Sequence, residues 1–207
     1  MKIGVIQASS VSNKNELLYK TVKQYAKKHE VINFGCFDNE DNYSYINISI
    51  EIGLLLATKS IDFIVTGCSS GQGMMLACNN MPGVICGYAP TPMDAYLFAQ
   101  INNGNAISLP LGESYTYLGE DNCIKTIEKL FSEPFGQGYP KNESERKLKD
   151  TNLLKDIKEK SHINICDLLE RIDKETLKKA LSRKNVIEYI FKNGKDNLIL
   201  EFIKKNY

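Results

Sequence analysis

The stretch DFIVTGCSSGQGMMLACNN, residues 62–80, decides how this chain folds. An apolar run ends in the turn Gly-Cys-Ser-Ser-Gly-Gln-Gly, after which apolar residues recur at near-helical spacing. This pattern predicts a buried strand, a glycine-rich turn and the start of a helix. Such a turn directs several free backbone N–H groups at one point, and the helix dipole adds partial positive charge there. The stretch therefore predicts a cradle for an anionic group.

Cys68 lies at the mouth of this turn, where a nearby helix start favours the reactive thiolate. A thiolate beside backbone donors suits proton transfer between adjacent carbons of a sugar, because the donors stabilise the enediolate that forms. In that chemistry we expect Ser70 to carry a proton between the two oxygens and Asn102 to bind the developing charge. The alternative stays open that Cys68 is a buried strand-end cysteine without chemistry, since glycine-rich turns between strands and helices are common.

The rest of the first 141 residues repeats the alternation of strand and helix. Strands are expected at residues 2–7, 30–34, 62–66, 84–88 and 106–109, and helices at about 13–28, 45–58, 91–100 and 120–131. No hairpin signal joins the strands, so the fold class is α/β. The pattern predicts a doubly wound, Rossmann-like, five-stranded parallel sheet with helices on both faces.

Small polar residues occupy three of the expected turns. These turns are residues 8–10, 68–70 and 102–103, and they contain Ser9, Ser10, Asn102 and Asn103. Ligands of such folds bind at the carboxyl ends of the strands, so we expect the three turns to converge on one pocket. The serines can also be helix caps, and the asparagines can be turn residues chosen for left-handed backbone conformations.

Composition changes after Pro140, and this change marks the expected domain boundary. We assign residues 1–141 to the α/β domain and residues 142–207 to an all-helical extension, which is rich in lysine and glutamate. Helices are expected at residues 144–160, at 167–181 with a break near Asp173, at 185–193 and after Gly194.

The overall composition limits the possible partners and the compartment. The formal net charge of +1 gives no overall attraction to nucleic acid or to a membrane surface. No apolar run has membrane-spanning length, and we expect no secretory leader because the first residues read as a strand. The six cysteines form no CxxC pair and no zinc-like cluster with histidine, so we expect free thiols, a cytoplasmic location, no metal and no cofactor.

The segment GCSSGQGMMLACNNMPGV, residues 67–84, resembles a motif of the ribose-5-phosphate isomerase type B and galactose-6-phosphate isomerase family. In that family a Cys-Gly-Thr-Gly-x-Gly turn leads into a helix that ends Ala-Ala-Asn-Lys. Residues 102–105, Asn-Asn-Gly-Asn, resemble the family's His-Asn-Asp-Ala-Asn segment without its histidine. Residues 134–138, Pro-Phe-Gly-Gln-Gly, are similar to its Pro-Phe-Glu-Gly-Gly ending. The resemblance covers residues 2 to about 139, and a longer subgroup of the family carries a helical extension.

This resemblance implies roles for individual residues. It implies an aldose–ketose isomerase that moves a proton between C1 and C2 of a small sugar phosphate through a cis-enediolate. Cys68 matches the base, Ser70 the hydroxyl group, and Asn102 the amide that helps to hold the enediolate. A pocket tyrosine matches Tyr45, and the anion cradle matches the backbone of Ser69 to Gly73, which includes Gly71 and Gln72. We add Ser9, Ser10 and Asn103 as further candidate substrate-binding residues. The family also implies a homodimer or homotetramer, in which the side chain at Asn102 reaches the partner's pocket.

The sequence departs from the family at the groups that open the sugar ring and grip the phosphate. Ala8 and Ser9 replace an Asp-His pair, and Ile101 replaces the ring-opening histidine. Gly112 and Tyr139 stand where the family has two phosphate-binding arginines. We hypothesise an open-chain substrate such as a tetrulose phosphate, its phosphate held by Ser9 and Ser10 with a basic residue, Lys141 or Arg146.

Two other functions remain open at this stage. One is a binding or regulatory protein that keeps the sugar pocket and has lost catalysis. The other is a flavodoxin-like module that binds a nucleotide or a flavin. Residues 71–73 lack the dinucleotide fingerprint and no Walker lysine follows, which disfavours the second alternative.

Overall fold

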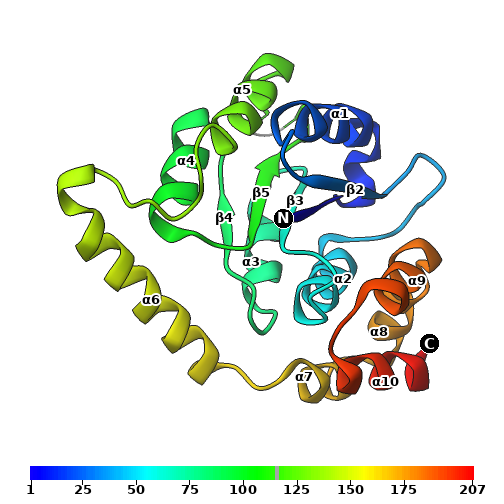
Figure 1. Ribbon diagram of the computed structural model, residues 1–207. Coiled ribbons are helices and arrows are strands. Elements are labelled where there is room, and N and C mark those ends of the chain that lie inside the picture. Colours follow the sequence, from blue (N-terminus) through cyan, green and yellow to red (C-terminus); the bar gives the residue numbers. More distant parts are fainter. Residues whose placement is uncertain (115–116) are drawn as a thin grey trace.

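The computed structural model describes residues 1–114 and 117–207, and within these residues five strands form one parallel sheet (Figure 1). Their order in space is β2-β1-β3-β5-β4. The strands are β1 (Lys2–Ile6), β2 (Glu30–Gly35), β3 (Phe63–Cys68), β4 (Cys86–Tyr88) and β5 (Ala106–Pro110). The predicted parallel sheet is confirmed. β3 runs two residues further than expected, so Cys68 is the last residue of a strand and not part of the turn itself.

The strand order creates a crevice at one place along the sheet. The chain leaves β1 toward β2 on one side and then crosses to β3 on the other side of β1. The loops that follow β1 and β3 therefore diverge, and such a switch in direction is where open α/β sheets bind ligands. Here those two loops begin with Gln7 and with Ser69.

Helices cover both faces of the sheet, as the alternating pattern predicts (Figure 1). One face carries α1 (Asn15–Tyr25), α4 (Pro92–Leu97) and α5 (Glu120–Leu130). The other carries α2 (Tyr45–Ala57) and α3 (Gln72–Asn79). A 3-10 turn, η1 (Ser9–Lys14), precedes α1, and a π-helical turn, η2 (Phe98–Asn102), follows α4.

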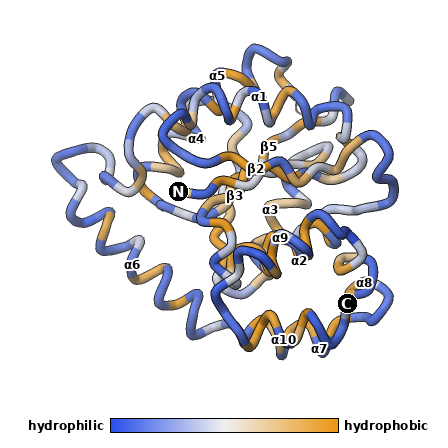
Figure 2. Tube along the Cα trace, turned by 45° about the vertical axis from the view of Figure 1, so that its right-hand side comes forward, coloured by the Kyte–Doolittle hydropathy of each residue, from blue (hydrophilic) through white to orange (hydrophobic). Residues whose placement is uncertain are grey.

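The end of the chain forms four short helices; the first three pack against α2, and the last packs against the first two. They are α7 (Ile165–Arg171), α8 (Lys174–Leu181), α9 (Lys184–Asn193) and α10 (Asn197–Asn206), with the expected break falling between α7 and α8. α2 is apolar on all sides because it is buried between the sheet and these helices. Figure 2 shows the apolar, orange segments of α2 and α9 next to each other. The α7–α10 helices thus share one hydrophobic core with the sheet, while the domain boundary near residue 141 stays a prediction.

The remaining helix of the extension, α6 (Ser144–Ser161), behaves differently. It follows a 3-10 turn, η3 (Lys141–Glu143), and extends along one side of the molecule (Figure 1). α6 is described throughout, and Thr151 is its one buried residue. Leu153, Leu154 and Ile157 are exposed, so this helix presents apolar side chains to solvent. No helix in the described part of the chain is both long and apolar enough to cross a membrane.

Candidate functional site

A cavity of about 560 Å³ lies in the crevice between the carboxyl ends of β1 and β3. Three segments form it: the loop after β1, the residues that precede and begin α2, and the turn after β3. The structure brings together seven of the predicted site residues, and the full lining is Ala8, Ser9, Ser10, Asn42, Tyr43, Ser44, Tyr45, Cys68, Ser69, Ser70 and Gly73. The predicted cradle thus faces a cavity large enough for a small sugar.

Cys68 combines deep burial with access to this cavity. Its side chain is 6% exposed, and its carbonyl accepts a hydrogen bond from the Leu111 backbone N–H at 3.1 Å. Burial raises the pKa of two other cysteines, that of Cys36 to about 12 and that of Cys123 to about 11. Those two thiols stay protonated at neutral pH and do not line the cavity. Cys68 is the thiol among the lining residues, so it is the one placed to act on a ligand.

The turn after Cys68 is fixed by the neighbouring strand β5. Ser108 Oγ donates a hydrogen bond to the Gly71 carbonyl at 2.6 Å. Gly71 has a positive φ of 75°, and a Cβ there would lie 2.8 Å from the Leu109 backbone, so a side chain would clash. Ser70 Oγ accepts a hydrogen bond from the Gln72 N–H at 3.3 Å, at the start of α3. The sequence predicted Gly71 and Gln72 as ligand contacts, but neither residue is part of the cavity lining.

The two serines of the first turn differ in what they can offer a ligand. Ser9 Oγ donates to the Tyr43 carbonyl at 3.1 Å and accepts from the Tyr43 N–H at 3.0 Å. Since a hydroxyl has one proton, Ser9 must give up its bond to Tyr43 before it can donate to an anion. Ser10 Oγ accepts a hydrogen bond from Ser69 Oγ at 3.4 Å, which leaves its own proton for a ligand. Ser10 is therefore better placed than Ser9 to bind an anion.

Asn102 and Asn103 do not join this cavity within one chain. They lie at the end of η2, which precedes the amino end of β5, whereas Cys68 pairs with the carboxyl end of that strand. Asn102 lines a separate cavity of about 450 Å³ together with Tyr88 and Leu154. Within one chain the third polar turn does not join the other two, because it lies before the amino end of its strand. That Asn102 reaches a partner's pocket stays a prediction.

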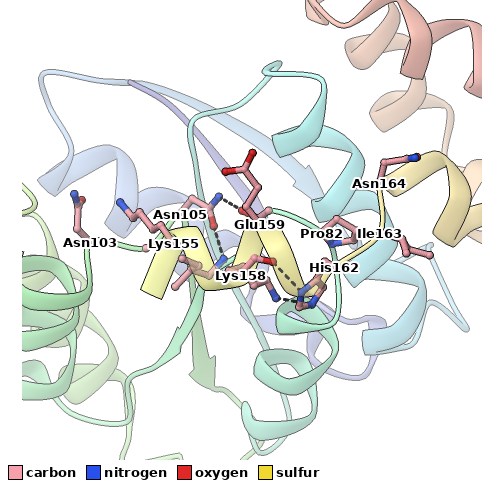
Figure 3. Close-up of a pocket in the computed structure, with 12 residues that line it drawn as sticks. Pro82, Asn103, Asn105, Lys155, Lys158, Glu159, His162, Ile163 and Asn164 are labelled. Carbon is pink, nitrogen blue, oxygen red and sulfur yellow. Dashed lines mark hydrogen bonds between the residues drawn. The ribbon is translucent and has the colours of Figure 1, made fainter. Parts of the chain in front are cut away.

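Asn103 lines a third cavity, of about 640 Å³, between α6 and the loops at the amino ends of β4 and β5 (Figure 3). Lys158 contributes to it, but its ammonium group already donates to the Asn79 carbonyl and lies 3.0 Å from Nε2 of His162. Burial also lowers the pKa of Lys158. The lining of this cavity contains no thiol and no hydroxyl group among the described residues. This third cavity is therefore not the one that holds the predicted chemistry.

Basic residues are missing from the Cys68 cavity. In the part of the chain that the structure describes, no lysine or arginine lines it. Lys141 is exposed in η3, and Arg146 is paired with Glu143 and with Asp150, so one chain does not bring either predicted phosphate contact to the cavity. The described residues also contain no cluster of three or more His, Cys, Asp or Glu side chains that could hold a metal ion.

The departures from the family motif have local physical reasons. The Gly112 N–H donates to the Ser69 carbonyl at 2.9 Å, and a Cβ at residue 112 would lie 2.7 Å from the Ser69 Cα. No side chain fits there unless the turn moves, so an arginine at this position is incompatible with the turn as it stands. Tyr139 packs edge-on against Tyr96, with ring centroids 5.6 Å apart. The aromatic side chain at residue 139 thus has a packing role.

The loop before α2 contributes lining residues that the sequence did not reveal. Asn42, Tyr43 and Ser44 form one wall of the cavity, although the sequence marks residues 35–42 only as a polar loop. Ser44 also caps α2 in a reciprocal pair with Asn47. This Ser-x-x-Asn spacing is a variant of the helix-start signal, so the end of the loop could have been located from it.

Comparison with known proteins places this architecture. The model of the ribose/galactose isomerase family matches residues 3–150 of the chain. A search of curated proteins gave no match. A crystal structure of 4-deoxy-L-threo-5-hexosulose-uronate ketol-isomerase, complexed with a tartrate, is 36% identical, with a TM-score of 0.91 over 100% of this chain and 99% of that one. The ribose-5-phosphate isomerase LacAB_rpiB from Vibrio parahaemolyticus is 35% identical, with a TM-score of 0.92 over the same shares.

Shorter relatives show how the extension stands apart. The type B ribose 5-phosphate isomerase from Trypanosoma cruzi has a TM-score of 0.64 and 20% identity, which shows a shared fold. All of that chain is covered, but only 78% of this one. The other two relatives match 100% of this chain, so the match includes its C-terminal helices. With 148 of its 207 residues matched by the family model, counted from residue 3 to residue 150, this chain belongs to the ribose/galactose isomerase family.

Proposed function

We propose that this protein is an aldose–ketose isomerase for an open-chain acidic sugar and that Cys68 is its base. The observation that carries the proposal is the cavity itself: the Cys68 thiol faces a space lined by hydroxyl groups, and no cationic side chain of the described residues lines it. The site thus has a proton acceptor and hydrogen-bond donors, but it lacks the charge that grips a phosphate dianion.

The proposed chemistry needs one proton transfer at carbon and one at oxygen. Cys68, as thiolate, removes the proton from the carbon next to the carbonyl, and the electron pair moves onto the carbonyl oxygen to give a cis-enediolate. Backbone N–H groups of the turn and the start of α3 stabilise that oxygen. Ser70 carries the hydroxyl proton from one oxygen to the other. Cys68 then returns its proton to the neighbouring carbon, so that the reaction is balanced without a cofactor.

The substrate class is inferred from two groups that the site lacks among the described residues, a ring-opening histidine and a cationic side chain. The two relatives that cover this whole chain are similar to it to nearly the same degree, yet one is a ribose-5-phosphate isomerase and the other a uronate ketol-isomerase. Ile101 replaces the family's ring-opening histidine, which favours a substrate that is already open. A carboxylate carries one negative charge where a phosphate carries nearly two, so donors such as Ser10 and the backbone suit it better. We propose a keto-uronate as the first choice and an open-chain tetrulose phosphate as the second.

We also propose a homodimer, or a tetramer built from it, whose active sites are shared. Asn102 lies before the amino end of β5, whereas the Cys68 cavity lies at the carboxyl ends of β1 and β3, so a second chain is needed to bring the amide to the thiol. The same partner would supply Lys141 or Arg146 if the substrate is a phosphate. This arrangement supports the second substrate choice and makes the position of Asn102 testable.

A substrate panel in deuterated water tests the proposal. The panel contains 4-deoxy-L-threo-5-hexosulose uronate, erythrose 4-phosphate, ribose 5-phosphate and galactose 6-phosphate, and NMR follows both turnover and deuterium uptake at the α carbon. We expect turnover with deuterium uptake on an open-chain substrate, the uronate above the tetrose. A preference for the cyclic pentose or hexose phosphates would overturn the choice of substrate. Binding without deuterium uptake on any compound would overturn the isomerase and indicate a binding or regulatory homologue.

A further inference from the structure

The loop formed by residues 36–44, which we call the substrate loop, receives side-chain contacts from the C-terminal helices. It joins β2 to α2, and its last residues line the Cys68 cavity. Phe37 is exposed, as are Asp38, Asn39, Asp41, Asn42 and Ser44. Two side chains of this loop after its first residue are partly buried, Glu40 and Tyr43. Both contact the C-terminal helices, so the loop is held from outside the α/β domain.

Arg183, the residue that precedes α9, is the centre of these contacts. Its side chain is fully buried. Its Nε and Nη2 donate to the two carboxylate oxygens of Glu40 at 3.0 and 2.9 Å, a bidentate arrangement that fixes both distance and direction. Its Nη1 donates to Glu51 of α2 at 2.7 Å, and Nη2 also donates to the Phe34 carbonyl at the end of β2. The Arg183 side chain thus connects the substrate loop to β2 and α2, the two elements that flank it.

Tyr43 is held by the same segment. The Lys179 ammonium lies 4.0 Å from the centroid of the Tyr43 ring, and the Arg183 guanidinium carbon lies 5.3 Å from it. The Tyr43 hydroxyl is 3.0 Å from Ser182 Oγ. A ring with two cations near it and a hydrogen bond at its hydroxyl group has one strongly preferred position. The end of α8 therefore fixes where Tyr43 sits.

Hydrogen bonds to its backbone connect Tyr43 to the first turn, residues 8–10. The Tyr43 carbonyl accepts hydrogen bonds from the Ser9 N–H at 3.0 Å and from Ser9 Oγ at 3.1 Å. The Tyr43 N–H donates to Ser9 Oγ at 3.0 Å. A shift of Tyr43 would thus move Ser9 and change the shape of the cavity on two sides.

We propose that the C-terminal helices act as a positioning element for the substrate loop, with Arg183, Lys179 and Ser182 as positioning residues for substrate binding. None of the three lines the cavity, so they act through Tyr43 and Glu40. The effect on turnover rests on the proposed function, whereas the effect on the loop does not. The extension of this family member is then part of the binding apparatus and not an addition to the surface.

The double variant Lys179→Ala, Ser182→Ala tests this positioning. It removes two contacts to Tyr43 and leaves the buried charges of Arg183 paired, so the fold is retained; Arg183→Met would leave Glu40 and Glu51 without their cation. Hydrogen exchange measured by mass spectrometry, on the protein without substrate, should show residues 36–45 exchanging about 5- to 30-fold faster. Residues 62–70 should be unchanged. With an active substrate, KM should rise by a similar factor while kcat changes little.

Two controls keep the result specific. Ile203→Val removes one methylene from the buried side of α10, which carries none of the three positioning residues, and should leave exchange at residues 36–45 unchanged. Lys179→Arg, with Ser182 retained, should restore the slow exchange because a cation remains over the ring. Unchanged exchange in the double variant, or an equal change in Ile203→Val, would overturn the proposal. A wild-type protein without isomerase activity would overturn the proposed function alone, since exchange is measured without substrate.

Discussion

The two walls of the Cys68 cavity are held in place by different means. The wall formed by residues 67–73 is fixed by its neighbours in the sheet, through the bond from Ser108 to the Gly71 carbonyl and the bond from Gly112 to Ser69. The opposite wall, the substrate loop, is fixed by Arg183, which is 143 residues away from Glu40 in the sequence. The wall with the proposed base is thus encoded in one stretch, while the wall that shapes the substrate space depends on distant contacts. Related proteins can therefore keep the wall with the base while the wall that shapes the substrate space changes.

The largest effect should come from the first wall. Cys68→Ala removes the proposed base, and turnover should fall at least about 10²-fold because general acid–base catalysis contributes that much or more. Thermal unfolding should change little, since the turn is held by backbone bonds that this substitution leaves intact. Steady-state kinetics and a melting curve on the same sample check both parts.

Cys166→Ser provides the matched control for Cys68→Ala. Cys166 is a partly exposed free thiol on α7 that does not line the cavity. Its replacement should leave turnover unchanged. If Cys68→Ala retained wild-type turnover, the strand-end cysteine without chemistry would be the correct interpretation.

The second prediction concerns the proposed dimer, in which Asn102 of a partner chain would complete the Cys68 cavity. Cys68→Ala and Asn102→Ala should each be inactive alone, but mixed dimers contain one site with both intact groups. Random mixing should therefore restore about a quarter of wild-type activity in a symmetric dimer. Unfolding and refolding the two variants together, followed by an activity assay, measures this recovery. If the mixture stays inactive while the proteins form dimers, Asn102 does not serve the partner's site.

Sequence patterns were sufficient for the elements that depend on local contacts. The alternation of strands and helices predicted the parallel sheet, and the Gly-Cys-Ser-Ser-Gly-Gln-Gly turn predicted where the cavity lies, because backbone geometry and glycine placement decide both. The break near Asp173 was also visible, since this residue caps α8 by accepting from the Thr176 N–H.

Sequence patterns failed where position is decided by contacts between distant segments. Local patterns could not show that Asn102, before the amino end of β5, lines a different cavity of the same chain from Cys68. Arg183 stands in a lysine-rich segment and looks like a surface residue, yet its side chain is fully buried between two carboxylates. Only the folded arrangement of α2, the substrate loop and α8 reveals that burial.

The last prediction concerns the anchor of the substrate loop, where the pH dependence of stability can be measured. Burial raises the pKa of Glu51 to about 8, opposed by the nearby Arg183 and assisted by the Glu40 charge. Glu51 Oε1 has no hydrogen-bond partner among the described residues, an arrangement that costs less for a neutral carboxyl than for a charged one. The folded protein therefore keeps a proton on Glu51 over a pH range in which the unfolded chain has lost it.

The sign of the resulting pH dependence follows from this difference. A pKa that is higher in the folded state adds stability below the unfolded value, 4.5, and this contribution is lost as the pH rises toward about 8. Urea unfolding of wild type and Glu51→Gln should show the wild-type free energy of unfolding falling, relative to the variant, by up to about 1.4 kcal/mol per pH unit. Above pH 8 the difference should level off. A constant difference from pH 5 to pH 9 would mean that Glu51 is already ionised beside Arg183, and that the loop is anchored by a complete buried ion pair.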